Sequence, residues 1–322
     1  MKSPARRAVG PIVVAILVAL GTAWGVRDPT PAAATPPGVN GAIVFAKEVK
    51  GDFELFAVEA DGTAERRLTN VDGDAVHPDW SPDGQRIVFE LDHKHAKKPY
   101  CSIALMSADG SGLTDLAAGM RGCDNQPSFT PDGQRIVFVH YDEDKDIERI
   151  ALMNLDGSGR HDIRTPWRNG VTDPNVSPDG KTITFVRLKE EGKLQALIAM
   201  RPDGSKLRRL TPYGWGVAIK HDWSPDGTRI ALTTNADFAR PGSANLITIR
   251  PSGAIATRLT RFRGGKRNAF AGSFSPDGKQ IVLRLEQGNT FGLAVIGRDG
   301  RGLHPITTPS SSKPRFIDWG PR

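Results

Sequence analysis

Polar residues that could bind a ligand recur at one place in a repeated sequence pattern. They are His77, Gln126, Asp173, Lys220 and His221. Each lies two or three residues before an apolar residue that is followed by Ser-Pro-Asp-Gly or Thr-Pro-Asp-Gly. Imidazole and carboxylate groups can transfer protons or bind metals, and an ammonium group can bind an anion. Whether these side chains meet depends on the elements that carry them.

The motif itself is repeated along the chain. Five copies occur, at His77–Gly84, Gln126–Gly133, Asp173–Gly180, Lys220–Gly227 and Ala271–Gly278, and a degenerate sixth, Phe316–Arg322, ends the sequence. The motif aspartates are 49, 47, 47 and 51 residues apart. This period is typical of one four-stranded propeller blade.

Three further strand signals follow each motif. An apolar segment such as Arg86–Phe89 comes first, then a strand ending in an Asp-Gly or Ser-Gly turn, and then a short segment such as Arg208–Thr211. Their β-branched and aromatic residues favour strands. We therefore predict an all-β, six-bladed β-propeller of four-stranded antiparallel blades.

The two ends of the repeat region should share one blade. Ala42–Phe45 corresponds to a second strand, and the segment around Trp319 supplies a first strand with nothing after it. We expect these N- and C-terminal strands to pair and close the ring, which removes an exposed sheet edge. The motif aspartates should serve the turns, and the motif tryptophans and phenylalanines should pack between blades.

The motif Pro-x-Trp/Phe-Ser-Pro-Asp-Gly, the apolar strand and the late Asp-Gly resemble the WD-like repeats of the TolB-like propeller family over about 280 residues. The same repeat occurs in peptidase propellers and some polysaccharide lyases, so the resemblance implies a fold more than a function. The resemblance covers the propeller domain of TolB proteins and not the α/β domain that precedes the propeller in those proteins.

The first 40 residues have a different character. Lys2, Arg6 and Arg7 precede an apolar stretch, which predicts a signal peptide or N-terminal membrane anchor over residues 1–26. Residues 27–40 are rich in Pro and Ala and read as a linker. The propeller then spans 41–322, and we expect it to be extracytoplasmic: periplasmic, secreted or on the cell surface.

The remaining signals concern chemistry and partners. Cys101 and Cys123 should lie close together on the loop side, and in an oxidising compartment we expect a disulfide between them, two unpaired thiols being the alternative. The net charge of +7 is spread along the chain, which argues against nucleic acid as a partner. We find no catalytic set, no metal site and no cofactor motif in the sequence.

Function is expected where the first strands begin. There His77, Gln126, Asp173, Lys220 and His221 should surround a channel mouth, near the longer loops. Our leading hypothesis is a monomeric, non-catalytic propeller that binds a protein, peptide or cell-envelope ligand. The alternative is a polysaccharide lyase or hydrolase with its site at the channel, and a third hypothesis is recognition of an anionic envelope polymer by basic loops such as 261–267.

Overall fold

The computed structural model describes residues 38–116, 122–190, 192–235 and 242–322. In this part of the chain the elements are strands, together with one short 3-10 helix, η1 (Tyr213–Trp215). No helix among the described residues is long and apolar enough to cross a membrane. The predicted segment 1–26 and most of the predicted linker, 27–37, lie outside the described residues.

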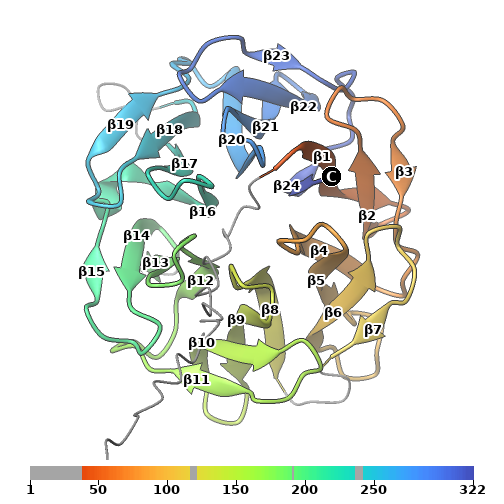
Figure 1. Ribbon diagram of the computed structural model, residues 1–322, viewed down its shortest axis with the longest axis vertical. Coiled ribbons are helices and arrows are strands. Elements are labelled where there is room, and N and C mark those ends of the chain that lie inside the picture. The colour runs from red at the N-terminus through yellow and green to blue at the C-terminus, as the bar shows by residue number, and fades with distance from the viewer. Residues whose placement is uncertain (1–37, 117–121, 191, 236–241) are drawn as a thin grey trace, which may run out of the picture. The chain divides into compact units, whose positions relative to one another are not determined.

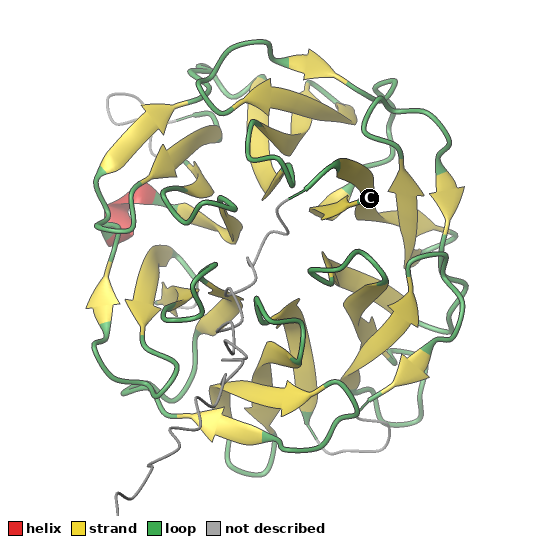
Figure 2. Ribbon diagram, in the orientation of Figure 1, coloured by secondary structure: helices red, strands yellow, loops and turns green. Residues whose placement is uncertain are grey.

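The strands form antiparallel sheets arranged around a centre (Figures 1 and 2). One sheet has the order β24 (Arg315–Pro321), β1 (Asn40–Val49), β2 (Asp52–Val58), β3 (Arg66–Arg67). A second is β12 (Val171–Val176), β13 (Ile183–Lys189), β14 (Leu194–Met200), β15 (Arg208–Arg209). A third is β16 (Val217–Trp223), β17 (Ile230–Thr234), β18 (Asn245–Ile249), β19 (Ile255–Arg258). A fourth is β20 (Arg267–Phe274), β21 (Gln280–Gln287), β22 (Thr290–Gly297), β23 (His304–Pro305).

The remaining strands form a single eight-stranded sheet. It contains β4 (Asp74–Trp80), β5 (Arg86–Asp92), β6 (Cys101–Ser107), β7 (Thr114–Asp115), β8 (Cys123–Phe129), β9 (Arg135–Asp142), β10 (Ile147–Asn154) and β11 (His161–Ile163). Its two halves are joined by one parallel pairing, Cys101 with Cys123. The all-β propeller is therefore confirmed, whereas the described strands form four separate four-stranded sheets and one larger sheet in place of the six separate ones expected.

Six inner strands lie nearest the centre in Figure 1: β4, β8, β12, β16, β20 and β24. Each contacts the inner strands on both sides of it, so together they form a closed ring. The inner strands start at the end where the longer loops lie, here called the loop end. At the opposite end, the turn end, all but β24 are followed by a tight turn. The candidate ligand-binding residues belong to the loop end.

The tight turns follow the chemistry of their sequence. Ser81 Oγ donates a hydrogen bond of 2.6 Å to Asp83 Oδ1, which also accepts the backbone N–H of Gln85 at 3.0 Å. Gly84 has φ +68°, in the left-handed region that glycine adopts without steric cost. The same arrangement recurs at Asp132, Asp179, Asp226 and Asp277. The motif aspartates thus serve the turns, as predicted.

The first and last described strands share one sheet. β24 pairs antiparallel with β1, placing Trp319 opposite Ile43, and the Trp319 indole N–H donates to Gly41 O at 3.0 Å. The backbone N–H of Arg322 donates to Val39 O at 2.9 Å. These bonds join the two ends of the repeat region within one sheet, in which β24 is the inner edge strand like the first strands of the other sheets.

Aromatic residues of the motif fill the space between neighbouring sheets. Trp80, Phe129, Trp223, Phe274 and Trp319 are all buried. Trp80 packs with Val44 and Leu55 of the preceding sheet, and Phe274 packs with Leu246 of its own preceding sheet. Burial of such rings provides much of the apolar area that holds one sheet against the next.

Candidate functional site

Each inner strand is interrupted near its loop end by a β-bulge. The register shifts between Val76 and Asp79 in β4, and the equivalent shift occurs in β8, β12, β16, β20 and in the pairing of β24 with β1. At four of these bulges a residue other than glycine has a positive φ: His77 (49°), Gln126 (53°), Asp173 (52°) and Phe316 (51°). A bulge changes the direction of the side chain that it carries. A positive φ at a residue other than glycine costs free energy, so the surrounding structure must stabilise it.

At Gln126 and Asp173 this stabilisation includes a hydrogen bond from the backbone N–H to a side chain outside the strand's own four-stranded unit. The backbone N–H of Gln126 donates to Glu90 Oε2 at 3.1 Å, and Gln126 Oε1 accepts the backbone N–H of Asp173 at 2.7 Å. Asp173 Oδ2 in turn accepts the backbone N–H of His221 at 3.0 Å. A separate bond of this kind runs from Ala271 N–H to Thr233 Oγ1 at 2.7 Å. Polar contacts therefore link neighbouring inner strands along part of the loop end.

His221 and Asp173 form the most buried of these contacts. His221 is fully buried, its Nδ1 lies 2.8 Å from Asp173 Oδ2, and its Nε2 lies 2.9 Å from Thr184 Oγ1. Burial alone would raise the pKa of Asp173. The hydrogen bond and charge of His221, with the charge of Lys220, outweigh it and hold that pKa below its usual value.

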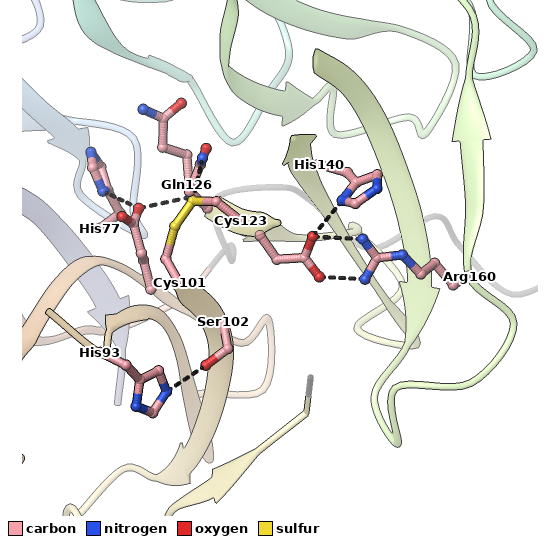
Figure 3. Close-up of a disulfide and its surroundings, with 11 residues drawn as sticks. His77, His93, Cys101, Ser102, Cys123, Gln126, His140 and Arg160 are labelled. Carbon is pink, nitrogen blue, oxygen red and sulfur yellow. Dashed lines mark hydrogen bonds and ion pairs between the residues drawn. A yellow bond between two sulfur atoms is a disulfide. The ribbon is translucent and has the colours of Figure 1, made fainter. Parts of the chain in front are cut away.

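His77 lies on β4, the inner strand that precedes β8 and Gln126. Its Nδ1 is 2.8 Å from Glu90 Oε2, and its ring contacts Phe316 with the centroids 3.7 Å apart. Figure 3 shows His77 and Gln126 on either side of the Glu90 contact, close to the disulfide. Like Gln126, Asp173 and His221, this side chain already has a protein partner.

The disulfide joins Cys101 and Cys123, whose Cα atoms are 4.5 Å apart, at the point where the two halves of the eight-stranded sheet meet (Figure 3). Next to it, Asp124 is held by His140 Nδ1 at 2.9 Å and by Arg160. Burial would raise the pKa of Asp124, but its hydrogen bonds to Arg160 and His140 lower it overall. The disulfide ties the two halves of the eight-stranded sheet together, and its cysteines are not in Cys-x-x-Cys spacing.

A second ring of residues, which the sequence analysis did not single out, lies one step further along the inner strands. It comprises Asp79, Ser128, Asn175, Asp222, Ser273 and Asp318. Asp79 Oδ2 accepts the backbone N–H of Phe129 at 2.8 Å, Asp318 Oδ2 that of Trp80 at 2.9 Å, and Asp222 Oδ2 that of Phe274 at 2.8 Å. Their signal in the sequence is the polar residue just before each motif aromatic.

Lys220 supplies the positive charge for these carboxylates. Burial would lower its pKa, but the charges of Asp173, Asp318, Asp79 and Asp222 outweigh burial and raise it, so the ammonium stays protonated. The pKa of Asp79 is raised well above its usual value by burial and by Asp318, against the lowering effect of Lys220. Of the five predicted residues, Lys220 is the one that combines a charge with a place on a cavity.

That cavity has a volume of about 450 Å³ and opens at the loop end, between the inner strands β16, β20 and β24. Lys220, Arg284, Lys313 and Arg315 line it, together with apolar side chains that include Phe270, Phe316 and the exposed Ile219. Lys313 and Arg315 belong to a basic segment visible in the sequence. Arg284 and Phe270 were not predicted as site residues, because they lie on strands outside the repeated motif.

The loop end presents groups that could bind a ligand. Among the described residues, no group of three or more His, Cys, Asp or Glu side chains could hold a metal ion. His77 contacts Glu90 of its own sheet, and Gln126, Asp173 and His221 are engaged in contacts between sheets. Of the predicted set, only Lys220 lines the cavity. Cationic groups above an apolar floor can hold a ligand by charge and by apolar contact.

Comparison with known proteins agrees with this architecture. The family model described as the TolB beta propeller domain matches residues 95–316, more than half of the chain. The Tol-Pal system protein TolB of Anaeromyxobacter dehalogenans (strain 2CP-C) is 36% identical over 86 residues, which are 27% of this chain and 18% of that protein. The same protein of Anaeromyxobacter sp. (strain K) gives equal identity and coverage. The match thus spans less than a fifth of the curated relatives' length.

Solved structures share the fold. TolB from Acinetobacter baumannii superposes with a TM-score of 0.68 and 23% identity, over 88% of this chain and 67% of that one. A putative TolB from Agrobacterium tumefaciens gives 0.63 and 16%, over 88% and 100%. A chain of the nidogen/laminin complex gives 0.64 and 14%, over 86% and 97%. With the family match over residues 95–316, these observations show that the chain belongs to the TolB β-propeller family.

Proposed function

We propose that this protein is a non-catalytic, extracytoplasmic binding module of six blades, which captures a protein or peptide partner at its loop end. The observation that carries the proposal is the cavity beside Lys220, where cations and apolar side chains meet on a rigid ring of strands. The eight-stranded sheet counts as two blades in this proposal, because a single parallel pairing joins its halves. The ring then has one inner strand for each of six blades.

Location in the cell envelope is part of the same proposal. Residues 1–26 would direct export or anchor the chain, residues 27–40 would act as a linker, and 41–322 would be the propeller, working as a monomer. The curated relatives are named as Tol-Pal system proteins, which supports an envelope role. The disulfide between Cys101 and Cys123 is in keeping with an oxidising compartment.

Photocrosslinking tests this proposal in the cell that produces the protein. A photoreactive amino acid would replace Ile219, an exposed residue of the cavity (38% exposed), and in a matched control it would replace Leu207 (37% exposed) on the β14–β15 connection. We expect a discrete crosslinked partner from position 219 in the extracytoplasmic fraction and none from 207. Adducts in the cytoplasmic fraction, or equal adducts from both positions, would contradict the proposal.

The lyase or hydrolase alternative has its own readout. The purified full chain would be incubated with acidic polysaccharides, and the release of unsaturated products or reducing ends would be followed. We expect no turnover above a boiled sample. Turnover that disappears in a Lys220→Met variant, with the protein still folded, would replace the binding proposal by catalysis at the channel.

A further inference from the structure

We propose that the cavity beside Lys220 is a carboxylate-binding pocket whose ligand is an acidic peptide segment, in which a carboxylate stands next to an apolar side chain. This inference rests on the proposed function and names the chemistry of its partner. It depends on three properties of the cavity: its charge, the hydrogen-bond donors of Arg315 and the apolar character of its walls.

The charge is unbalanced. The described residues lining the cavity include four cations and no carboxylate. Just behind the wall, Glu286 Oε1 contacts both Arg284 Nε at 2.9 Å and Lys313 Nζ at 2.8 Å, so one carboxylate is shared by two cations. Burial lowers the pKa of Arg284; the charge and hydrogen bond of Glu286 oppose this effect, and the nearby charge of Arg315 adds to it. An incoming anion would relieve this repulsion.

Arg315 is the cation with the most freedom to bind. Among the described residues its guanidinium forms no ion pair, and it lies over the ring of Phe53 with 4.9 Å between the guanidinium carbon and the ring centroid. Stacking on an aromatic ring fixes the plane of the group and leaves its N–H donors at the edge. A planar guanidinium held in this way suits a carboxylate, which it can bind through two parallel hydrogen bonds.

Lys220 contributes a donor but little surplus charge. Its ammonium is already balanced by the charges of the buried carboxylates of Asp173, Asp318, Asp79 and Asp222. It therefore closes the inner side of the cavity, while Arg284, Lys313 and Arg315 supply the uncompensated charge. This asymmetry places the favoured position for an anion toward β24 and β21, away from the ring of aspartates.

The walls favour a peptide over a sugar chain. Phe270, Phe316, Ile219 and Ile317 line the cavity, and Arg284 lies over the face of Phe270, 4.1 Å from its centroid. A polysaccharide needs many hydrogen-bond partners along its hydroxyl groups, whereas this wall offers apolar contact beside a few cations. A volume of about 450 Å³ accommodates two or three side chains, so an acidic residue beside a Leu or Phe fits it.

Fluorescence anisotropy with the purified full chain tests the inference. The probes are fluorescein-labelled peptides carrying Leu-Glu or Phe-Asp pairs, their Gln and Asn counterparts, and each series with a free or an amidated C-terminus. We expect acidic peptides to bind at least tenfold more tightly than amide counterparts. Binding that survives amidation assigns the ligand carboxylate to a side chain, and binding that needs the free terminus assigns it to a C-terminus.

Variants locate the binding. Arg315→Gln, at an exposed position, should weaken binding of the acidic peptides about tenfold, and Lys313→Gln should weaken it as well. The matched control is Arg301→Gln, an arginine whose side chain is 89% exposed in the β22–β23 turn. It should leave affinity unchanged. Thermal unfolding of each variant establishes that the fold is intact.

The possible results distinguish a failure of the carboxylate-pocket inference from a failure of the proposed binding function on which it rests. Equal binding of acidic and amide peptides, or acidic binding unaffected by Arg315→Gln, would overturn the carboxylate pocket and leave the binding module standing. Capture of oligouronates, lost in Arg315→Gln, in place of peptides would overturn the peptide assignment. Absence of peptide binding together with absence of any crosslink from position 219 would overturn both.

Discussion

His221 Nδ1 lies 2.8 Å from Asp173 Oδ2, and the same oxygen accepts a hydrogen bond from the backbone N–H of His221. The two residues belong to adjacent inner strands, β12 and β16, and both are buried. One carboxylate oxygen thus fixes a side chain and a backbone group of the next sheet. The residues that looked like ligand-binding groups in the sequence are here the joint between two sheets.

Asp173→Ala should destabilise the protein by about 2 kcal/mol, because the buried N–H of His221 loses its acceptor. The pKa of Asp173 is lower in the folded state than in the unfolded state. Its contribution is therefore complete above about pH 4 and is lost as the pH falls through the folded-state pKa. Urea unfolding at pH 7, 5 and 3 measures this.

The control for that experiment is Asp299→Ala, an aspartate whose side chain is 62% exposed in a turn. It should change stability by no more than about 0.5 kcal/mol. A deficit for Asp173→Ala that is as large at pH 3 as at pH 7 would contradict the role given to its charge.

Lys220→Met should destabilise the protein by about 3 kcal/mol at pH 7, because buried carboxylates lose their counter-charge. Lowering the pH should shrink this deficit, since the pKa of Asp79 is raised and this group takes up a proton first. Stability would be compared at pH 7 and 4.5. Lys181→Met, with a side chain 80% exposed, is the matched control and should behave like the wild type.

Cys101→Ser with Cys123→Ser should lower stability by about 3 kcal/mol, because the bond closes a loop across 22 residues. Reducing the wild-type protein should produce the same loss, and reducing the double variant should produce none. Thermal unfolding with and without reductant measures both effects. Titration of two free thiols in the protein isolated from the extracytoplasmic fraction would contradict the bond.

Trp319→Ala should cost about 3–5 kcal/mol, because a fully buried ring and its hydrogen bond to Gly41 are lost where the two ends of the propeller meet. Leu207→Ala, at an exposed position, is the control. Chemical unfolding followed by tryptophan fluorescence and by circular dichroism checks it. A wild-type midpoint in the Trp319 variant would show that the closing sheet contributes little.

Much of the fold was predictable because each repeat contains a short sequence that forms a tight turn. Ser-Pro-Asp-Gly fixes where each inner strand ends, and the fixed spacing of these turns leaves room for the strands that follow. The sequence also predicted the pairing of the segment around Trp319 with that around Ile43. The merging of two sheets at Cys101 and Cys123 was not predicted, since it depends on one local backbone pairing.

The site was predictable only in part. The position of a residue in the repeat indicated that it lies at the loop end. Whether its side chain faces the cavity or is held by another residue depends on its neighbour in the next sheet. Asp173 and His221 satisfy one another, whereas Lys220, adjacent in sequence, reaches the cavity. Arg284 and Phe270 carry no motif, and only the packing of β20, β21 and β24 brings them beside Arg315.

Closure of the ring by β1 and β24 also determines how the molecule can come apart. In most domains the chain ends fray first, because they have the fewest neighbours. Here the two ends of the repeat region, β1 and β24, lie side by side in one sheet and pair with each other, with β24 as the inner edge strand. Opening is therefore expected to begin at the seams between neighbouring sheets, where contacts that involve side chains hold the structure in place of a backbone ladder.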